Sequence, residues 1–494
     1  MKKVIRIHRL DNVAVATEDI PAGAALEIEG VLLAAAQDIP AGHKVALRPI
    51  RAGEDIVKYG FPIGRAARDI GAGAWVHTHN AASNLEGLRE YAYRPVACPD
   101  RSEPPARFMG YARPDGSVGV RNEIWIIPTV GCVNGVAEAI EELANAERPA
   151  GVSRVCACTH PYGCSQLGGD LLMTRKALCG LIRHPNAAGA LVLGLGCENN
   201  QIDGLKETLG AYDPARVRFL VCQQAEDEIA EGLGIVRALM ERASRCVRTP
   251  TPASKLVVGL KCGGSDGFSG ITANPLLGAF TEKLVAQGGS ALLTEVPEMF
   301  GAETILMNRC VNEDVFGKTV SLINGFKGYF MRYGEKIDEN PSPGNREGGI
   351  TTLEEKSLGC IQKGGRAPVV DVLAYGDPVR AAGLSLLQAP GNDLVSSAAL
   401  AVSGAQIVLF TTGRGTPFGC PVPTLKIATQ SGLAARKPGW IDFNAGSLLE
   451  GASMEDEAEA LFRLTLSVAS GETEPKSERL SKRNLAIFKD GVTL

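Results

Sequence analysis

The sequence predicts a multidomain α/β protein, in which a small all-β module precedes two α/β domains with mainly parallel sheets. Three observations predict this fold class. Residues 1–95 repeat one short turn sequence, the remainder alternates strand-like apolar runs with segments of helical length, and two proline-rich stretches divide the chain. A chain of 494 residues also exceeds what one hydrophobic core usually supports, so several domains are expected.

The N-terminal module, residues 1–95, is predicted from a turn sequence that occurs four times. The copies are Ile20-Pro-Ala-Gly23, Ile39-Pro-Ala-Gly42, Ile50-Arg-Ala-Gly53 and Ile70-Gly-Ala-Gly73. Each copy suits a β-turn that needs a positive φ angle at its glycine, and a short apolar stretch follows each one. We therefore expect short strands joined by tight turns, ending at His77-Thr-His79-Asn80.

A linker at residues 96–108 and a first α/β domain at residues 109–248 are predicted next. The stretch from Pro95 to Pro105 is rich in proline and charge, as linkers are. Beyond it, apolar strands alternate with helical segments at Val136–Ala144 and Leu171–Ile182, which is the pattern of a parallel sheet. The predicted strands are Ile124–Val130, Val152–Cys158, Ala190–Leu195 and Phe219–Cys222.

The second proline cluster, Thr249-Pro-Thr-Pro252, opens the last predicted domain, residues 249–494, which we expect to be the catalytic one. A glycine-rich loop from Asn340 to Gly349 leads into Thr352-Leu-Glu-Glu355, a capping-box pattern that predicts a short helix ending at Gly359. The strands expected here are Leu256–Leu260, Ala291–Glu295, Ile407–Thr411 and Leu425–Ala428.

Composition excludes several classes of partner. The net charge of -4 and the pI near 6.0 leave no basic face for nucleic acid. No apolar run has the length of a membrane span, and the N-terminus lacks the apolar core of a secretory signal, so we expect a cytoplasmic protein. With 13 cysteines, an odd count, and no export signal, metal-binding or reactive thiols are favoured over a disulfide framework.

Candidate metal ligands follow the predicted strands, where ligands bind in open α/β sheets. Four cysteines lie beside glycines at these positions and are candidates for thiolate ligands of iron: Cys132, Cys164, Cys197 and Cys262. No two of them have the close spacing of a standard iron–sulfur motif, so a single ion and a cluster are both open. The alternative is that glycine-rich turns merely accommodate small residues. His77 and His79 can chelate a metal if they lie on one face of a strand.

Basic residues in the same loops are candidates for binding a carboxylate. Arg121 and Arg414 suit bidentate pairing, and Arg414 lies between glycines directly after a strand. A nucleotide site has weaker support, because Gly194-Leu-Gly196 begins like a dinucleotide fingerprint but Asn199 occupies the third glycine position.

Taken together, these loops resemble the altronate and galactarate dehydratase family almost end to end. The closest likeness is to its altronate branch, through Gly131-Cys-Val-Asn134 and Cys197-Glu-Asn-Asn200. Other segments that carry the resemblance are Gly119-Val-Arg-Asn122, Tyr162-Gly-Cys-Ser-Gln166, Cys262-Gly-Gly-Ser-Asp-Gly267, Glu295-Val-Pro-Glu298, Asn340-Pro-Ser-Pro-Gly-Asn345 and Lys356-Ser-Leu-Gly359. The resemblance implies a SAF-type β-clip fold for the N-terminal module and a need for Fe2+, with Mn2+ or another divalent metal as alternatives and an iron–sulfur cluster still open.

The resemblance also implies a reaction, the dehydration of D-altronate to 2-dehydro-3-deoxy-D-gluconate in hexuronate catabolism. A base removes the proton next to the carboxylate, a metal or cation stabilises the enediolate, and an acid or metal helps the 3-hydroxyl leave. The expected catalytic residues are His160, Glu295 and Lys356. The expected substrate ligands are Arg121, Asn122, Arg414, Ser265 and Asn345, and the expected metal ligands are Cys132, Cys164, Cys197, Cys262, His77 and His79.

Other functions compete with this one. A galactarate dehydratase or a related hydroxy-acid lyase, such as a sulfolactate enzyme, shares the scaffold. A nucleotide-dependent oxidoreductase and a sugar-acid binding protein without turnover are more distant alternatives. In each case the partner is a small molecule, and a homo-oligomer in which a second subunit completes the glycine-rich loops is also compatible with the sequence.

Overall fold

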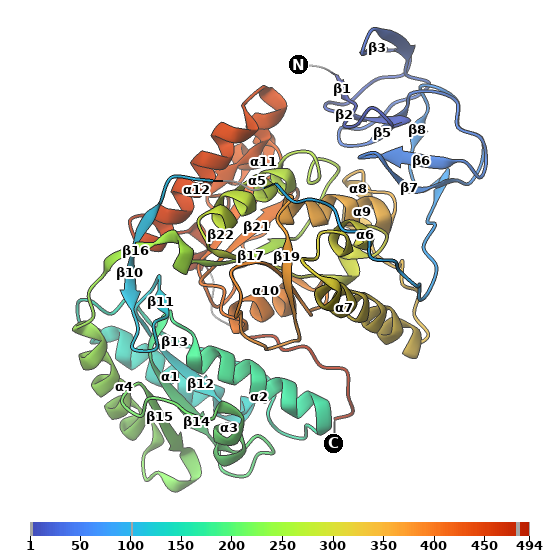
Figure 1. The fold of residues 1–494 in the computed structure, drawn as a ribbon. Helices are drawn as coiled ribbons and strands as arrows, with labels where there is room; N and C mark the ends of the chain where they lie inside the picture. The colour runs from blue at the N-terminus through green and yellow to red at the C-terminus, as the bar shows by residue number, and fades with distance from the viewer. Residues whose placement is uncertain (1–2, 100–101, 481–484, 494) are drawn as a thin grey trace.

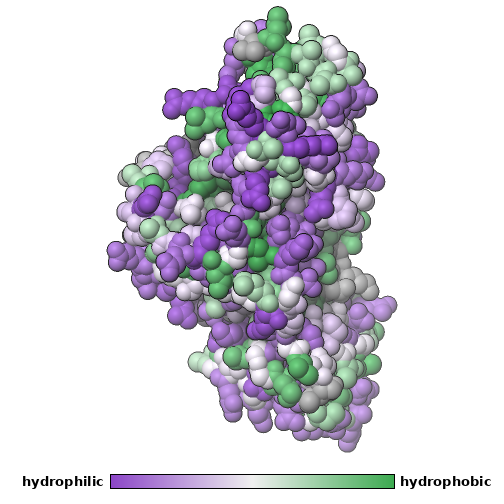
Figure 2. Space-filling model, turned by 90° about the vertical axis from the view of Figure 1, so that its right-hand side faces the viewer, coloured by the Kyte–Doolittle hydropathy of each residue, from purple (hydrophilic) through white to green (hydrophobic). Residues whose placement is uncertain are grey.

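The computed structural model describes residues 3–99, 102–480 and 485–493. Figure 1 shows a β-rich module at one end of the molecule, a large α/β unit in the middle and a smaller α/β unit at the other end. The predicted fold class is therefore confirmed. Within the described ranges, no helix is both long and apolar enough to cross a bilayer. On the face shown in Figure 2, hydrophobic groups are scattered among hydrophilic ones.

The N-terminal module consists of short antiparallel strands. One sheet has the order β1-β2-β5-β8, a second has the order β6-β7-β9, and β3 pairs with β4. The bounds are β1 Val4–Ile5, β2 Val13–Ala16, β3 Ala25–Ile28, β4 Val31–Ala34, β5 Lys44–Ala46, β6 Asp55–Lys58, β7 Phe61–Ala66, β8 Trp75–Val76 and β9 Ala81–Ala82.

The four repeated turns pair two by two, which the sequence alone did not predict. Ile20 and Ile39 exchange two backbone hydrogen bonds of 2.9 and 2.8 Å, and Ile50 and Ile70 do the same. The carboxylate of Asp38 accepts from the Ala22 backbone N–H at 2.7 Å. Each pair thus locks two turns into one unit. The predicted positive φ angles are present, at 77° for Gly23, 81° for Gly42, 82° for Gly53 and 78° for Gly73.

Two of these glycines provide a matched test of the turns. Alanine at Gly53 meets no atom within 4 Å, so G53A should cost only the left-handed strain, about 1–2 kcal/mol of unfolding free energy. At Gly73 the added methyl group would lie 2.0 Å from the Ala34 carbonyl oxygen, so G73A should cost about 1–3 kcal/mol more. Denaturant unfolding of both variants measures the difference, and equal losses would contradict this account of the turn.

The segment after β9 runs along the middle unit without forming a helix or strand in its described part (Figure 1). The Tyr91 hydroxyl donates to the Glu303 carboxylate at 2.6 Å, and the Tyr93 hydroxyl donates to the Cys310 carbonyl at 2.5 Å. The predicted linker, residues 96–108, therefore follows directly after a segment that is hydrogen-bonded to the middle unit.

The smaller α/β unit has a parallel sheet of order β13-β12-β14-β15. All four predicted strands and both predicted helices are present. The bounds are β12 Glu123–Pro128, β13 Val155–Ala157, β14 Ala187–Gly194, β15 Val217–Val221, α1 Asn134–Ala146, α2 Gly168–Arg183, α3 Ile202–Leu209 and α4 Glu228–Ser244. Helices α1 and α4 pack together through a buried apolar cluster that includes Ile140 and Val236.

The proline cluster at residues 249–252 is a strand instead of a plain connection. This strand, β16 (Thr249–Pro252), pairs with β10 (Arg107–Ala112), which also pairs with β11 (Val118–Gly119). The segments that enter and leave the smaller unit are therefore hydrogen-bonded to each other.

The large unit has a seven-stranded sheet of order β19-β20-β18-β17-β21-β22-β23, in which every neighbouring pair is parallel. The four predicted strands are present, and β19, β20 and β23 are additional. The strand bounds are β17 Val257–Cys262, β18 Ser290–Leu293, β19 Val369–Leu373, β20 Gly383–Leu387, β21 Ile407–Thr412, β22 Thr424–Ala428 and β23 Phe443–Asn444.

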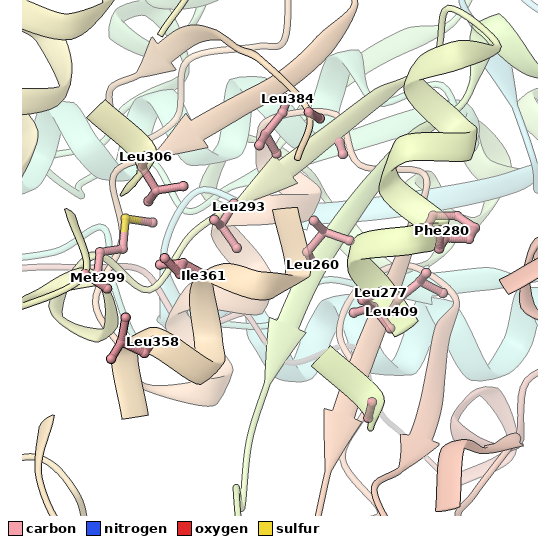
Figure 3. Packing of buried hydrophobic residues seen from close by; sticks show 14 of the residues in the cluster. Leu260, Leu277, Phe280, Leu293, Met299, Leu306, Leu358, Ile361, Leu384 and Leu409 are labelled. Carbon is pink, nitrogen blue, oxygen red and sulfur yellow. The ribbon is translucent and has the colours of Figure 1, made fainter. Parts of the chain in front are cut away.

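Helices of this unit pack on the sheet through leucine-rich contacts. Figure 3 shows Leu277 and Phe280 of α5 beside Leu260 and Leu409 of the sheet, all fully buried. The helix bounds are α5 Ala273–Ala286, α6 Glu303–Met307, α7 Glu313–Arg332, α8 Pro343–Glu347, α9 Leu353–Cys360, α10 Asp393–Val402, α11 Ser431–Arg436, α12 Met454–Ser470 and α13 Lys476–Leu480. The predicted short helix is α9, with its first turn capped by the Thr352 side chain and its end one residue beyond Gly359.

Candidate functional site

A buried cluster of thiols, carboxylates and ammonium groups lies where β17 and β18 end. Cys262 is the last residue of β17, and Glu295 and Glu298 follow β18. Cys360, the last residue of α9, completes the cluster. Glu295 has left-handed backbone angles, φ 67° and ψ 55°. This conformation is costly for a residue other than glycine, and such strain is concentrated at functional sites.

Three side chains of this cluster converge on one point. The Cys262 and Cys360 sulfur atoms are 3.3 Å apart, and Glu298 Oε2 lies 3.0 Å from Cys360 Sγ and 3.5 Å from Cys262 Sγ. Among the described residues, these three form the one group of possible ligands whose atoms all lie within 4.8 Å of one another. Their convergence in the core makes them the best-placed metal ligands in the described structure.

Three buried lysines balance the acidic groups of the cluster. Lys261 and Lys363 both pair with Glu295, the second at 2.6 Å, and Lys363 Nζ also lies 3.0 Å from Cys262 Sγ. Lys356 pairs with Glu298 at 2.8 Å. Lys261 pairs further with Asp393 at 2.8 Å. The three ammonium charges therefore equal the three carboxylate charges when both thiols are protonated.

The protonation states follow from these contacts. Burial opposes the charge on Glu298, but Lys356, Lys261 and Lys363 outweigh it and lower the pKa of the carboxyl to about 2. The hydrogen bond with Cys262, together with burial, raises the pKa of the Cys360 thiol. At neutral pH Glu298 is a carboxylate and Cys360 a thiol. A divalent ion that displaced two thiol protons would leave the net charge of the cluster unchanged, and two sulfurs with one oxygen suit iron or zinc.

Lys356 connects the cluster to a small cavity. Its ammonium group donates to the side-chain oxygens of Asn340 and Asn345 at 3.0 and 3.1 Å, and the Asn345 amide donates to the Ser265 carbonyl at 2.9 Å. The cavity is lined by Ser265, Asp266, Asn274, Lys356, Glu355 and Cys360, together with Lys58 and Tyr59 of the N-terminal module. The predicted residues Ser265, Asn345 and Lys356 are thus brought together.

The N-terminal module contributes two lysines beside this cavity. Lys44 Nζ and Lys58 Nζ each lie 2.8 Å from a different carboxylate oxygen of Glu355, and all three side chains are buried. Lys44 also donates to the Gly349 carbonyl at 2.8 Å. Burial opposes the charge on Glu355, but the two ammonium groups outweigh it and lower its pKa to about 2. This ion triad joins the module to the large unit.

Comparison with known proteins identifies the family. Over 498 residues, covering all of both chains, the sequence is 52% identical to the altronate dehydratase of Bacillus subtilis. The chain belongs to the altronate/galactarate dehydratase family. An Escherichia coli altronate dehydratase is 51% identical over 99% of each chain, and an Escherichia coli galactarate dehydratase (L-threo-forming) is 34% identical over 98% of this chain and 96% of its own.

Three models of the altronate/galactarate dehydratase family match consecutive parts of the chain. They are the altronate/galactarate dehydratase SAF domain at residues 2–84, the D-galactarate dehydratase/altronate hydrolase second domain at 110–244, and the D-galactarate/altronate dehydratase C-terminal model at 253–493. The expected SAF-type module is confirmed. The buried cluster falls within the C-terminal match.

The other predicted metal ligands of this dehydratase family member lie apart from the buried cluster. Cys132, Cys164 and Cys197 are exposed on the loops after β12, β13 and β14. His77 stacks on Trp75 and approaches the Thr351 hydroxyl at 3.2 Å, while His79 packs on the same indole ring. Burial lowers the pKa of His77 to about 4, so it is neutral at pH 7. Within the described chain, neither histidine is in a group of three ligand atoms that fits one ion.

Three predicted site residues are engaged elsewhere in the family fold. Arg121 forms a partly buried ion pair with Glu478 at 2.7 Å. The side-chain amide of Asn122, just before β12, donates to the backbone carbonyls of Gly151 and Ala243 at 2.8 and 2.9 Å. The His160 ring bonds the Pro128 carbonyl at 2.8 Å through Nε2 and accepts from the Tyr162 N–H through Nδ1, while burial lowers its pKa to about 4. Since both ring nitrogens are occupied, His160 is a loop-fixing residue here.

Arg414 lies near the cavity, as predicted for a residue of the site. It is half-exposed, pairs with Glu347 at 2.8 Å, and its backbone N–H donates to Gly264, next to Ser265. The residues that sequence reasoning did not single out are mostly buried and charged: Lys44, Lys58, Lys261, Glu298, Glu355, Cys360 and Lys363. Cys360 directly follows the family segment Lys356-Ser-Leu-Gly359, and Glu298 ends the segment Glu295-Val-Pro-Glu298. Their position in or beside these segments was the one sequence signal that pointed to the site.

Proposed function

We propose that this chain is a hydro-lyase that dehydrates D-altronate to 2-dehydro-3-deoxy-D-gluconate in hexuronate catabolism. The observation that carries the proposal is the identity of 52% and 51% with two altronate dehydratases over nearly the whole chain, against 34% with the galactarate dehydratase. We further propose that it works in the cytoplasm on a small-molecule substrate, and that residues 249–494 form the catalytic domain, after the module at 1–95, the linker at 96–108 and the second domain at 109–248.

We assign the substrate to the loops around Lys356, which must separate to admit it, because the cavity between them has a volume of only about 10 Å³, the space of one water molecule. Burial opposes the charge on Lys356, but Glu298 outweighs it and raises the pKa of the ammonium group, so it is a fixed cation at neutral pH. Such a cation can stabilise a substrate carboxylate and the enediolate formed from it. Ser265, Asn345 and Arg414 are our candidates for binding the remaining oxygens.

Proton transfer is assigned to a carboxyl group in the same cavity. Burial raises the pKa of Asp266, which brings it closer to the pH at which a general base works best. Glu295 is already paired with two lysines, so we give it a positioning role, holding Lys261, Lys363 and Cys262 in place.

We propose that the metal is Fe2+, with Mn2+ or another divalent ion as substitutes, and that Cys262, Glu298 and Cys360 would hold it. Bound there, it would supply a Lewis acid that stabilises developing negative charge and assists loss of the hydroxyl. Treatment with a chelator should lower both activity and metal content, and Fe2+ should restore both.

A panel of sugar acids tests the proposed reaction. We expect kcat/KM for D-altronate to exceed that for galactarate and for sulfolactate by at least roughly 100-fold, because a site built to hydrogen-bond particular hydroxyl groups discriminates strongly. Formation of the 2-keto acid product, followed by a coupled assay, measures each rate. Turnover of galactarate without turnover of altronate would overturn the assignment.

A further inference from the structure

The three exposed cysteines of the smaller unit share one sheet edge. Cys132 follows β12, Cys164 follows β13 and Cys197 follows β14, and these strands are neighbours in the order β13-β12-β14. Among the described cysteines, only these three are exposed. Free cysteine is one of the most frequently buried residue types, so three exposed thiols at one edge are not explained by packing.

The loops that carry these cysteines are fastened to one another. The Gly131 N–H donates to the Tyr162 carbonyl at 2.9 Å, and the Asn200 N–H donates to the Gly163 carbonyl at 3.0 Å. The Ser165 N–H donates to the Asn199 side chain at 2.7 Å. Each of the three cysteines is therefore no more than three residues from a hydrogen bond that joins its loop to a neighbouring loop. The thiols are held on a rigid, shared rim.

Close packing and unusual backbone angles reinforce this rim. A methyl group at Gly163 would lie 2.1 Å from the Thr129 carbonyl oxygen, so the loops touch through backbone. Ser165, next to Cys164, has a φ of 57°, and Gly196, next to Cys197, has a φ of 129°. Such angles are maintained where the surroundings enforce them, frequently at ligand sites.

We propose that Cys132, Cys164 and Cys197 hold an iron–sulfur cluster of the four-iron type, each thiol losing its proton to bind one iron. Tetrahedral ligands of a single ion with 2.3 Å bonds lie about 3.8 Å apart. These three sulfurs do not form a group within 4.8 Å in the described structure, which disfavours a single ion. A cluster spreads its thiolates over several irons and therefore suits a wider triangle.

Three thiolates leave the fourth iron without a protein sulfur ligand. An open metal position marks a catalytic or ligand-binding site. A surface pocket lined by Gly196, Glu198, Gln201, Lys206 and Gln224 opens beside Cys197. The open iron would take an oxygen ligand of the hydroxy-acid class at a second binding site, distinct from the one beside Lys356, and this one part of the inference rests on the proposed function.

The test is anaerobic reconstitution of the full chain with sulfide and equal amounts of Fe2+ and Fe3+, the ratio that balances the charge of the oxidised four-iron cluster, followed by iron and acid-labile sulfide analysis and by EPR after reduction. We expect about five irons per chain, four in the cluster and one at Cys262, Glu298 and Cys360, together with about four sulfides, and a loss of most of the sulfide in C132S, C164S and C197S. C222S is the matched control, because Cys222 follows the adjacent β15 but is half-buried, and it should keep the cluster.

Iron without sulfide in the wild-type chain, or equal loss in C222S, would overturn the cluster. Addition of D-altronate should change the EPR spectrum of the reduced cluster, and an unchanged spectrum would overturn the hydroxy-acid ligand. Altronate turnover by chain that lacks sulfide would leave the proposed function standing while the cluster failed. A chain that holds the cluster but does not turn over altronate would leave the cluster standing while the proposed function failed.

Discussion

Replacing Glu355 by glutamine should lower the free energy of unfolding by about 3–5 kcal/mol, the usual cost of removing one partner from a buried ion pair. Lys44 and Lys58 are both fully buried against this carboxylate, so E355Q leaves two ammonium groups in the core without their counter-charge. Denaturant unfolding monitored by circular dichroism gives the loss. The control is E347Q, since Glu347 pairs with Arg414 at the surface and its loss should change stability by less than about 0.5 kcal/mol.

The effect of E355Q should depend on pH in a defined direction. The pKa of Glu355 is lowered from 4.5 to about 2, so the triad contributes fully above pH 4.5 and its contribution is lost as the pH falls toward 2. The stability gap between wild type and E355Q should therefore be widest near neutrality and close in acid. A gap that is constant from pH 7 to pH 3 would show that Glu355 is not held as a carboxylate by the two lysines.

Replacing Lys356 by methionine should lower kcat by about 100- to 1000-fold, as expected for loss of one preorganised charge that stabilises a developing anion. Methionine approximates the length of the side chain but removes the ammonium group that contacts Glu298, Asn340 and Asn345. Steady-state kinetics with D-altronate measures the loss, and circular dichroism reports whether the fold is kept.

The matched control for K356M is K336M, because Lys336 is exposed and lies outside the cavity. Its kcat should stay within about twofold of wild type, since surface substitutions away from special features have small effects. If a folded K356M retained at least a third of the wild-type kcat, Lys356 would have no direct part in the reaction.

Most of the fold follows from periodicity and turn chemistry. The strands at the centre of each sheet, such as β12, β14, β17 and β21, are mainly apolar because both faces are covered, and the sequence predicts them directly although β12 begins with Glu123 and β17 contains Lys261. The missed strand β19, Val369–Leu373, lies at the edge of its sheet, where Asp371 interrupts the apolar run. Edge strands lack the continuous apolar signal, whereas β20, which was also missed, is an interior strand whose five residues include Gly383 and Ser385.

The candidate site was predicted only in part, for a physical reason. Cys262 ends a strand, Ser265 follows it and Asn345 lies in the glycine-rich stretch from Asn340 to Gly349, where ligand sites are expected, while Lys356 lies on the short helix α9 that follows. Lys261 and Lys363 are fully buried, yet lysine is almost always exposed, so nothing in their local sequence indicates an interior position. Their partner Glu295 lies 34 and 68 residues away, and pairing over such separations is visible only in three dimensions.

The ion triad also sets a condition on how the chain is made. Lys58 and Glu355 are 297 residues apart, so at a synthesis rate of 5–20 residues per second roughly 15–60 s pass between the two leaving the ribosome. Through that interval both lysines of the finished module stay hydrated, because their counter-charge has not yet been synthesised. The interface between the first and last parts of the chain therefore closes late. A ribosome-bound chain that stops before residue 355 leaves Lys44 and Lys58 exposed to water, whereas in the complete protein both are buried against Glu355.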